Sequence, residues 1–450
     1  MMADVTQLFD GAAEFERHCL GGTTPIVTYK SLAEEYGRLG LQPGSAILIL
    51  APNGLEFLQH WLAILSNGLV PVAISPSARS PRINRLRHEF GLAGVVGVKI
   101  NPSLYDASDF TAVGTFRFVR FHGVRPRYSP HEVLILTSGT SGVDSACVHR
   151  VDSLIANAAL HNQALGIRST DRQLVVLPMY YSFALVAQAI GSMICGCQLI
   201  IDGPPFANEH FFARITDKRI SVSAITPTLV RGILPYINNI PRLRVISVGG
   251  DQLSVNDART LKYSGAADEI YFTYGLTEAG PRVSTLAAHE EPDAKLGSVG
   301  RVFPGIETRI EARAGAKAGE LMLRTPTALL RKVGGAGKHP LDPDGWLRTG
   351  DLFTCDREGY LTYQGRLRDF VIIQGEKVNI KSVSRIAEEH PDVHHARAYV
   401  DGDGSLALSL QFRQTADVSV EIIKKFLRER LQRFEVPKNI VQVDSVEFRK

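Results

Sequence analysis

The sequence predicts an α/β protein. We expect a large amino-terminal domain of parallel-type sheets with flanking helices and a small β-barrel-like unit, followed by a small mobile α+β domain. At 450 residues the chain is too long for one compact core. Its hydrophobic content of 44% and charged content of 21% are ordinary for a globular protein. Short apolar runs alternate with helical patterns, which is typical of mostly parallel sheets.

This alternation begins near the amino terminus. A short strand at Thr28 precedes a helix with Ser31 near its N-cap. Strands at 46–50 and 70–74 flank a helix over 54–67 that presents a row of leucines on one face. These are Leu55, Leu58, Leu62 and Leu65. The next charged patch, interpreted as a solvated helix face, contains Arg79, Arg82, Arg85 and Arg87.

The middle of the chain continues the same pattern. The predicted elements are a strand at 133–136, a helix at 153–165, strands at 174–177, 199–201, 221–226, 243–248 and 270–272, and a helix opened by Pro227. Residues 173–201 carry no charge and are numerous enough to imitate a membrane span. Because Pro178, Gly191 and Gly196 interrupt them, we interpret this stretch as strand, loop and buried helix.

After residue 297 short strands and turns replace the long alternation, as in a small barrel-like unit. A hairpin is expected between 345 and 363. The carboxyl-terminal elements are a helix at 381–390, strands at 395–400 and 406–412, and an amphipathic helix at 420–433. We therefore predict two domains, 1–366 for binding ATP and an acid and 367–450 as a small lid.

Charge and cysteine usage narrow the class of protein. The formal net charge is +4 and the charges are scattered, which does not favour nucleic acid. Of five cysteines, Cys195 and Cys197 are separated by one residue, a spacing of neither a zinc pair nor a redox C-x-x-C. The amino terminus lacks the pattern of a signal peptide, so we expect a cytoplasmic protein.

A loop rich in hydroxyl residues and glycine follows the strand at 133–136. Its residues are Thr137, Ser138, Gly139, Thr140, Ser141 and Gly142. Backbone N–H groups and hydroxyls in such a turn form an anion cradle suited to a triphosphate. No Lys follows Gly142, so this is not the common P-loop, and a polar surface loop is the alternative.

Several separated motifs occur in the order of one family. They are Thr137–Gly142, Leu177–Phe183, Gly249-Gly250-Asp251, Tyr274-Gly275-Leu276-Thr277-Glu278, Thr349-Gly350-Asp351 and Gly365-Arg366-Leu367-Arg368-Asp369. With this set the chain resembles the adenylate-forming superfamily of acyl- and aryl-CoA synthetases, peptide-synthetase adenylation domains and luciferases. The resemblance extends over residues 25–450. It implies an enzyme that joins a carboxylate to the α-phosphate of Mg-ATP and passes the acyl group to a thiol.

The resemblance also assigns roles to residues. It implies that Thr277 touches the α-phosphate, that Glu278 holds Mg²⁺ and that Arg366 lies near ribose and phosphate. The implied ATP contacts are the loop 137–142, Gly249, Gly250, Asp251, Tyr274, Gly275, Asp351 and Arg366, and Arg368 is the hinge. Each has a structural alternative: a core aromatic for Tyr274, a helix start for Thr277-Glu278, turn chemistry for Asp351 and surface charge for the arginines.

The sequence departs from the family pattern at three places. The loop usually continues Pro-Lys-Gly, but Asp144-Ser145-Ala146 stands here. Ile372 replaces a usual Lys after the Gly-Arg motif. The family's adenylation Lys lies in a Gly-Lys pair near the carboxyl end, and Lys450 is the candidate replacement, with a frayed terminal Lys as the alternative.

The predicted acid pocket contains Tyr180, Tyr181, Phe183, Gly275, Ala279 and Gly280. No carboxylate occurs in 173–201 to pair with a substrate ammonium, so an α-amino acid is disfavoured. We expect an aromatic acid such as a hydroxybenzoate or cinnamate, with a fatty acid as the alternative and core packing as the structural alternative for these aromatics. The acceptor is CoA or the phosphopantetheine of an acyl carrier protein. A non-catalytic nucleotide-binding regulator and a membrane or scaffold protein are the other classes considered.

Overall fold

The computed structural model describes residues 5–19, 27–107, 109–137, 144–312, 316–335, 340–373, 376–413 and 419–443. By their internal contacts the residues form two compact units. The first unit contains residues 1–309, 322–349 and 355–362, and the second contains 310–321, 350–354 and 363–450. The phosphate-loop residues 138–143 and Lys450 lie outside the described residues.

The first unit contains a sheet of eight described strands with a parallel centre. Their spatial order is β17 (Arg331–Val333), β7 (Ser145–Arg150), β6 (Glu132–Thr137), β2 (Val70–Ile74), β1 (Ala46–Leu50), β3 (Leu92–Gly97), β5 (Phe116–Arg120) and β4 (Thr111–Val113). β1 pairs in parallel with both β2 and β3, and β2 pairs in parallel with β6. The strands on either side of this centre are antiparallel.

A second sheet in the same unit has seven described strands. Their order is β14 (Arg301–Val302), β13 (Arg282–Ala287), β12 (Ala267–Gly275), β11 (Leu243–Gly249), β10 (Val222–Ile225), β8 (Arg172–Val175) and β9 (Gln198–Ile201). The strands from β9 to β12 are parallel, and β13 returns antiparallel to β12. The carboxyl ends of β11 and β12 therefore meet at one edge, where α/β proteins bind ligands.

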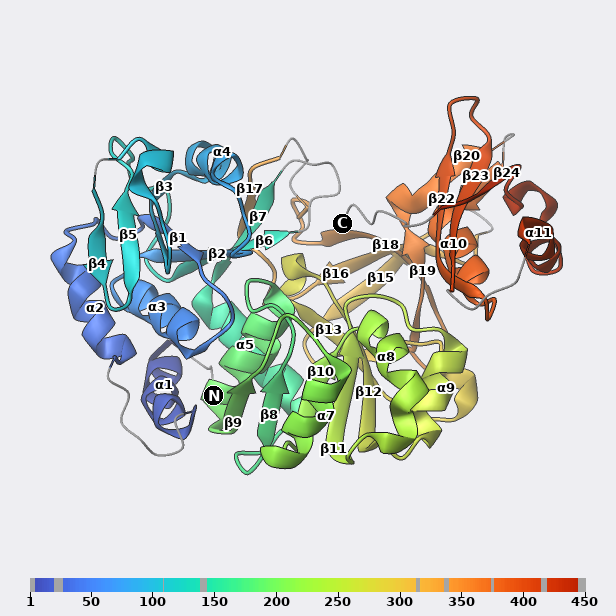
Figure 1. Ribbon diagram of the computed structural model, residues 1–450, viewed down its shortest axis with the longest axis horizontal. Coiled ribbons are helices and arrows are strands. Elements are labelled where there is room, and N and C mark those ends of the chain that lie inside the picture. Colours follow the sequence, from blue (N-terminus) through green and yellow to red (C-terminus); the bar gives the residue numbers. More distant parts are fainter. Residues whose placement is uncertain are drawn as a thin grey trace. The chain divides into compact units, whose positions relative to one another are not determined.

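Helices join the two sheets into one large core. It includes Ile47 of β1, Ile246 of β11 and side chains of α3 (Leu55–Ser66) and α5 (Val151–Ala164). Helices α7, α8 and α9 cover one face of the seven-stranded sheet (Figure 1). The other helices of this unit are α1 (Val5–Cys19), α2 (Tyr29–Arg38), α4 (Ser80–Phe90), α6 (Gly191–Cys195), α7 (Asn208–Asp217), α8 (Pro227–Ile233) and α9 (Val255–Tyr263).

The division between the units passes through a third sheet of four described strands. It consists of β15 (Glu307–Glu311), β16 (Gly319–Arg324), β18 (Leu347–Cys355) and β19 (Leu361–Arg366). The rest of the second unit has its own core around Val383, Leu408 and Ile423. Its elements are β20 (Phe370–Ile373), β21 (Glu376–Asn379), α10 (Ile380–Glu388), β22 (Val393–Val400), β23 (Leu406–Phe412), α11 (Val420–Arg428) and β24 (Asn439–Gln442).

Many predicted elements are confirmed. The strands at 46–50 and 70–74 have the bounds that the apolar runs predict. Pro227 opens α8, with the side chain of Thr226 accepting a hydrogen bond from the backbone N–H of Leu229. Within the described part of the chain, no helix combines the length and the apolar character that a membrane crossing requires. The uncharged stretch contains a π-helix over Phe183–Ile190 and then α6.

Some details of the prediction are wrong. Thr28 does not form the expected strand but is the N-cap of α2, which begins at Tyr29, so Ser31 lies inside the helix. The last helix was expected over 420–433, but it ends at Arg428 because the chain turns there before a short 3₁₀ segment at Arg433–Glu435. The arginines of α4 are not all solvated. Nε of Arg82 lies 3.1 Å from each carboxylate oxygen of Asp144. Arg82 is therefore tied to the segment that follows the phosphate loop.

Candidate active site

A short 3₁₀ turn, Thr277–Ala279, follows β12 and contains the central motif of the candidate site. Three consecutive carbonyls of this turn accept hydrogen bonds from elsewhere in the unit. Nε2 of His149 lies 2.9 Å from the carbonyl oxygen of Thr277. The backbone N–H of Leu329 donates to the carbonyl of Glu278 at 2.9 Å, and Thr327 Oγ1 donates to that of Ala279 at 2.6 Å. The turn is thus fixed on three sides, which preorganises Thr277 and Glu278.

His149 is an uncharged donor in this arrangement. Because a carbonyl only accepts, Nε2 of His149 must carry the proton. The side chain is fully buried, and its Nδ1 has no hydrogen-bond partner. Burial lowers the pKa of His149 to about 4, although the bond to Thr277 and the charge of Glu278 act in the opposite direction. His149 is therefore a neutral residue that positions the turn.

The aromatic segment 180–183 lies against this turn. Ser182 Oγ is 3.1 Å from Thr277 Oγ1. The segment is held upstream by Asn53, whose amide donates to the Leu177 carbonyl and accepts from the Met179 N–H, both at 2.8 Å. These contacts bring the predicted pocket segment next to the predicted α-phosphate contact.

Two tyrosines of this segment stay close together. The rings of Tyr180 and Tyr181 are tilted, with centroids 4.7 Å apart. Tyr181 remains 40% exposed, so its ring is accessible to a ligand. Burial, and then the neighbouring Tyr180, raise the pKa of the Tyr181 phenol, which therefore stays protonated at neutral pH.

The glycines of the site are required by close contacts. A Cβ atom on Gly275 would lie 2.0 Å from the carbonyl oxygen of Pro281. A Cβ atom on Gly249 would lie 2.4 Å from Oγ1 of Thr273. Gly250 has a φ of 96°, which other residues rarely adopt. These glycines thus allow close packing at the ends of β11 and β12, where Tyr274 is 9% exposed.

Glu278 forms an ion pair that the sequence did not indicate. Nζ of Lys332 lies 2.6 Å from its Oε1. The two side chains are 30% and 18% exposed, respectively, so the pair is only partly hydrated. Lys332 lies on β17, opposite Cys147 of β7. The phosphate loop connects β6 to β7. The pairing partner of Lys332, Cys147, is two residues after the first residue of β7.

Polar contacts hold the residues that precede and follow the phosphate loop. Thr137 Oγ1 lies 2.7 Å from Ser145 Oγ, which joins the end of β6 to the start of β7. Asp144, which stands where the family pattern has Pro, binds Arg82 through both oxygens. Hydrogen bonding to Asp144 raises the pKa of Arg82, so this arginine stays charged.

The second unit contains the other predicted ATP contacts. Nε of Arg366 lies 2.9 Å from Oδ1 of Asp351, whose side chain is 2% exposed. The predicted hinge Arg368 is followed by Asp369, whose carboxylate lies 3.6 Å from Nζ of Lys381. Asp351 and Arg366, which come from separate motifs, are therefore brought together.

Sequence reasoning missed two cations of the site. Lys332 is far from Glu278 in sequence and no local pattern links them. Arg282 begins β13, is 3% exposed, and its guanidinium carbon lies 3.5 Å from the centroid of the Phe183 ring. No local pattern marks Arg282, and its burial is known only from the structure, where it shares a face of β13 with the buried Ser284.

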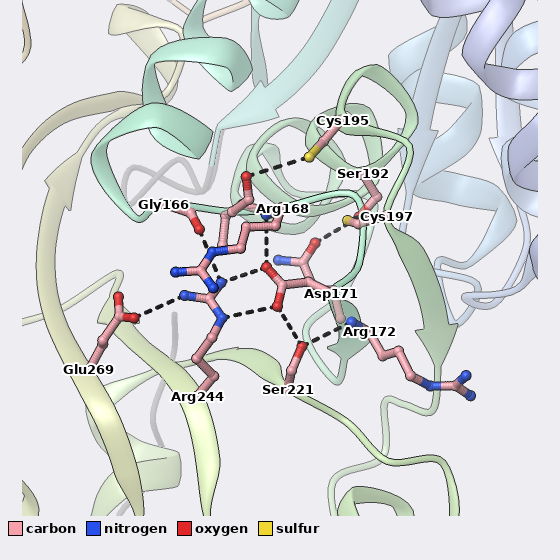
Figure 2. Close-up of polar contacts among 12 residues, drawn as sticks. Gly166, Arg168, Asp171, Arg172, Ser192, Cys195, Cys197, Ser221, Arg244 and Glu269 are labelled. Atoms are coloured by element: carbon pink, nitrogen blue, oxygen red, sulfur yellow. Dashed lines mark hydrogen bonds and ion pairs between the residues drawn. The ribbon is translucent and has the colours of Figure 1, made fainter.

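A second polar cluster lies at the opposite edge of the seven-stranded sheet (Figure 2). Nη2 of Arg244 is 2.5 Å from Asp171 Oδ2, and its Nη1 is 3.0 Å from Glu269 Oε1. Ser221 Oγ donates to Asp171 Oδ1 at 2.8 Å. Since these residues lie at or before the amino ends of β8, β10, β11 and β12, the cluster stabilises the sheet away from the motif edge.

Comparison with known proteins identifies the family of this chain. Residues 28–331 match the family model described as AMP-binding enzyme. The long-chain-fatty-acid–CoA ligase FadD13 of Mycobacterium tuberculosis is 24% identical, covering 91% of this chain and 86% of its own length. The salicylyl-CoA synthase/salicylate adenylyltransferase of a Streptomyces species is 23% identical, covering 94% and 87%.

The fold has solved relatives as well. The o-succinylbenzoate CoA synthetase of Bacillus subtilis, in complex with its acyl-adenylate intermediate, superposes with a TM-score of 0.81 at 21% identity. The superposition covers 93% of this chain and 88% of that one. The fold is therefore that of the adenylate-forming α/β proteins.

The chain belongs to the AMP-binding enzyme family. It is an ATP-dependent, AMP-forming ligase of the acyl- and aryl-CoA ligase group. Enzymes of this family use ATP with Mg²⁺ and CoA. The donor set fits Mg²⁺, which takes one or two carboxylates together with phosphates and water. Among the described residues no group of three or more His, Cys, Asp or Glu could hold a metal alone, and Glu278 supplies a carboxylate at the motif turn.

Proposed function

We propose that this ligase activates an aromatic carboxylic acid, such as a hydroxybenzoate or cinnamate, and transfers it to the thiol of CoA or of a carrier-protein phosphopantetheine. The single observation that supports this proposal best is the Ser182–Thr277 contact of 3.1 Å. It joins the aromatic segment at Tyr180–Phe183 to the turn assigned to the α-phosphate. An acid whose ring packs on the tyrosines has its carboxylate beside Thr277.

In the proposed reaction a carboxylate oxygen attacks the α-phosphorus of ATP. The bond from this phosphorus to the bridging oxygen breaks, and pyrophosphate leaves with the electron pair. A thiolate then attacks the acyl carbon, and AMP leaves as the thioester forms. The first step brings two anions together, so fixed donors and cations must compensate the charge.

The chain's residues take the following roles in this proposal. Thr277 hydrogen-bonds the α-phosphate, and the turn is held by His149, Leu329 and Thr327. Glu278 holds Mg²⁺, which when bound neutralises charge on the phosphates. Tyr274, Gly249 and Gly250 accept the adenine. Asp351 accepts the ribose hydroxyls and keeps Arg366 oriented. The loop 138–142 receives the β- and γ-phosphates.

A fatty acid is the second candidate substrate. The relatives named above include ligases for fatty and for aromatic acids, so similarity does not favour one class. The aromatic class is supported by the paired tyrosines and by Phe183, whose flat faces match a ring better than a flexible chain.

The test is acid-dependent ATP–pyrophosphate exchange across benzoates, cinnamates, fatty acids and amino acids. We expect exchange with benzoates or cinnamates, a loss of about 100-fold in Glu278→Gln, and little change in the control Glu290→Gln. Glu290 is a suitable control because its side chain is 74% exposed. Preferential exchange with fatty acids contradicts the aromatic assignment, and no exchange with any acid contradicts the proposed function. Thioester formation with CoA and with a phosphopantetheine-loaded carrier protein then identifies the acceptor.

A further inference from the structure

Arg282 is a buried cation that contacts Phe183, one of the residues predicted for the acid pocket. Its side chain is 3% exposed, and its Nε and Nη2 atoms have no hydrogen-bond partner. Burying an ionised group without a partner is costly, and proteins generally avoid it. An arginine retained in this state therefore indicates a group that it binds in a later state of the protein.

The charge partners of this guanidinium can be followed among the residues that the structure describes. Within the described part of the chain no carboxylate forms an ion pair with Arg282. Burial alone lowers its pKa to about 9, which leaves it charged at neutral pH. The titratable neighbour that responds to it is His161, and that ring is neutral because burial, and then the charge of Arg282, lower its pKa to about 3.

Two contacts locate the guanidinium. One is the ring of Phe183, 3.5 Å from the guanidinium carbon. The other is the end of β11, since a Cβ atom built on Gly249 would lie 3.1 Å from Nη1 of Arg282. The backbone of Arg282 pairs with Gly275 of β12. The side chain therefore crosses from β13 over β12 to the carboxyl end of β11, between the aromatic segment and the proposed adenine contact.

The position limits what this cation can bind. The reacting carboxylate must lie at the α-phosphate, beside Thr277, where Ser182 and the motif turn meet. Arg282 instead contacts Phe183, which by the proposed function packs on the body of the acid. A guanidinium presents N–H donors in a planar fork that matches a carboxylate. An acid with a second carboxylate on its ring or side chain satisfies this fork while its first carboxylate reacts.

We propose that Arg282 binds a second carboxylate of the substrate, so that the preferred substrates are aromatic acids with two carboxyl groups. This inference rests on the proposed function, and it makes the substrate class narrower. It also explains why a substrate with an ammonium group is excluded: the pocket has a cation where an amino-acid-activating site needs an anion.

The test compares matched acids in ATP–pyrophosphate exchange: benzoate with benzene-1,3- and 1,4-dicarboxylate, and cinnamate with 4-carboxycinnamate. In the unaltered protein we expect kcat/KM to be about 100-fold higher for the diacid of each pair. In Arg282→Met the ratio should fall to about one, because the group that distinguishes the acids is gone. Arg282→Lys keeps the charge without the fork and should give an intermediate ratio.

Other outcomes overturn the inference. The inference is wrong if the unaltered protein has equal kcat/KM for the monoacid and the diacid. It is also wrong if Arg282→Met lowers kcat/KM equally for all acids, because Arg282 would then act on the reacting carboxylate. In either case the proposed function stands, since exchange occurs.

If no acid supports exchange, the proposed function fails and binding decides the inference. A rise in the thermal midpoint with millimolar diacid, absent with the monoacid and absent in Arg282→Met, supports it, and no rise overturns it. The Met variant is expected to fold, because it removes an unpartnered buried charge and keeps a side chain that can pack on Phe183.

Discussion

Nζ of Lys332 lies 2.6 Å from Oε1 of Glu278, the carboxylate assigned to Mg²⁺. A carboxylate can accept a hydrogen bond and bind a metal ion at the same time, but the positive charge of the ammonium group opposes a second cation beside it. Lys332 therefore competes with Mg²⁺ for Glu278 through charge repulsion. Lys332 lies on β17, which pairs with β7, the strand that follows the phosphate loop.

Replacing Lys332 with Met should lower the Mg²⁺ concentration needed for half-maximal pyrophosphate exchange. The lysine competes for the carboxylate, and a partly exposed ion pair of this kind is worth about 1 kcal/mol, or about 5-fold in concentration. The measurement is exchange activity against free Mg²⁺ at saturating ATP. Arg331→Met is the matched control, because Arg331 is the next residue of β17 and its Nη2 pairs instead with Glu132 at 2.8 Å. An unchanged or higher Mg²⁺ requirement in Lys332→Met contradicts the competition.

Replacing His149 with Leu should lower kcat by about 10-fold, because the Thr277 carbonyl loses its donor and the turn is no longer fixed on that side. The KM for the acid should change less than kcat, since the aromatic segment keeps its Asn53 contacts. Steady-state kinetics of the variant provide this comparison. His60→Leu is the control: His60 is equally buried and bonds Tyr36 at 2.8 Å, remote in sequence from the motif turn. Equal loss of kcat in both variants would indicate general destabilisation rather than positioning.

The sequence predicts many individual strands well because apolar runs and their flanking turn residues are visible locally. The run at Ala46–Leu50 is apolar throughout and follows a glycine, so its bounds are visible without the fold. The motif at Tyr274–Glu278 is likewise visible, because it follows an apolar strand. Elements that end by tertiary contact are harder, and α11 ends five residues before its amphipathic pattern does.

The partners of the site residues could not be predicted in the same way. Lys332 meets Glu278 because β17 pairs with β7 across a long separation in sequence. Arg282 looks like an ordinary charged residue at the start of a strand. It becomes notable only when the face of β13 that contains Arg282, Ser284 and Leu286 proves to be buried. Local periodicity reports which face a side chain occupies, but not what lies opposite that face.

Replacing Arg244 with Met should destabilise the first unit by about 3–5 kcal/mol, because Asp171 would keep a buried charge without its partner. The side chains of Arg244 and Asp171 are 17% and 4% exposed. Burial acts to raise the pKa of Asp171, but hydrogen bonds from Arg244, Arg168 and Ser221 outweigh it and hold the pKa below its ordinary value. Urea unfolding gives the free energy. Arg242→Met is the matched control. The side chains of Arg242 and its partner Asp268 are 69% and 49% exposed, so this substitution should cost under about 1 kcal/mol. Similar losses in both variants would contradict a special role for the buried pair.

The stability of the first unit should fall as the pH drops from about 6.5 toward 4, because three buried histidines are neutral in the native state. Burial lowers the pKa of His60 and of His161 to about 3, and that of His149 to about 4. In this window the unfolded chain binds protons at these rings and the native protein does not. The free energy of unfolding therefore decreases with falling pH, by about 1.4 kcal/mol per pH unit for each fully responding histidine.

Urea unfolding at a series of pH values measures how steeply the free energy of unfolding changes with pH. His60→Gln should reduce this slope by the contribution of one histidine. His122→Gln is the matched control, because the side chain of His122 is exposed. A slope near pH 5 that is unchanged in His60→Gln would mean that this ring is protonated in the native state. That result would contradict the neutral state that burial favours for this ring.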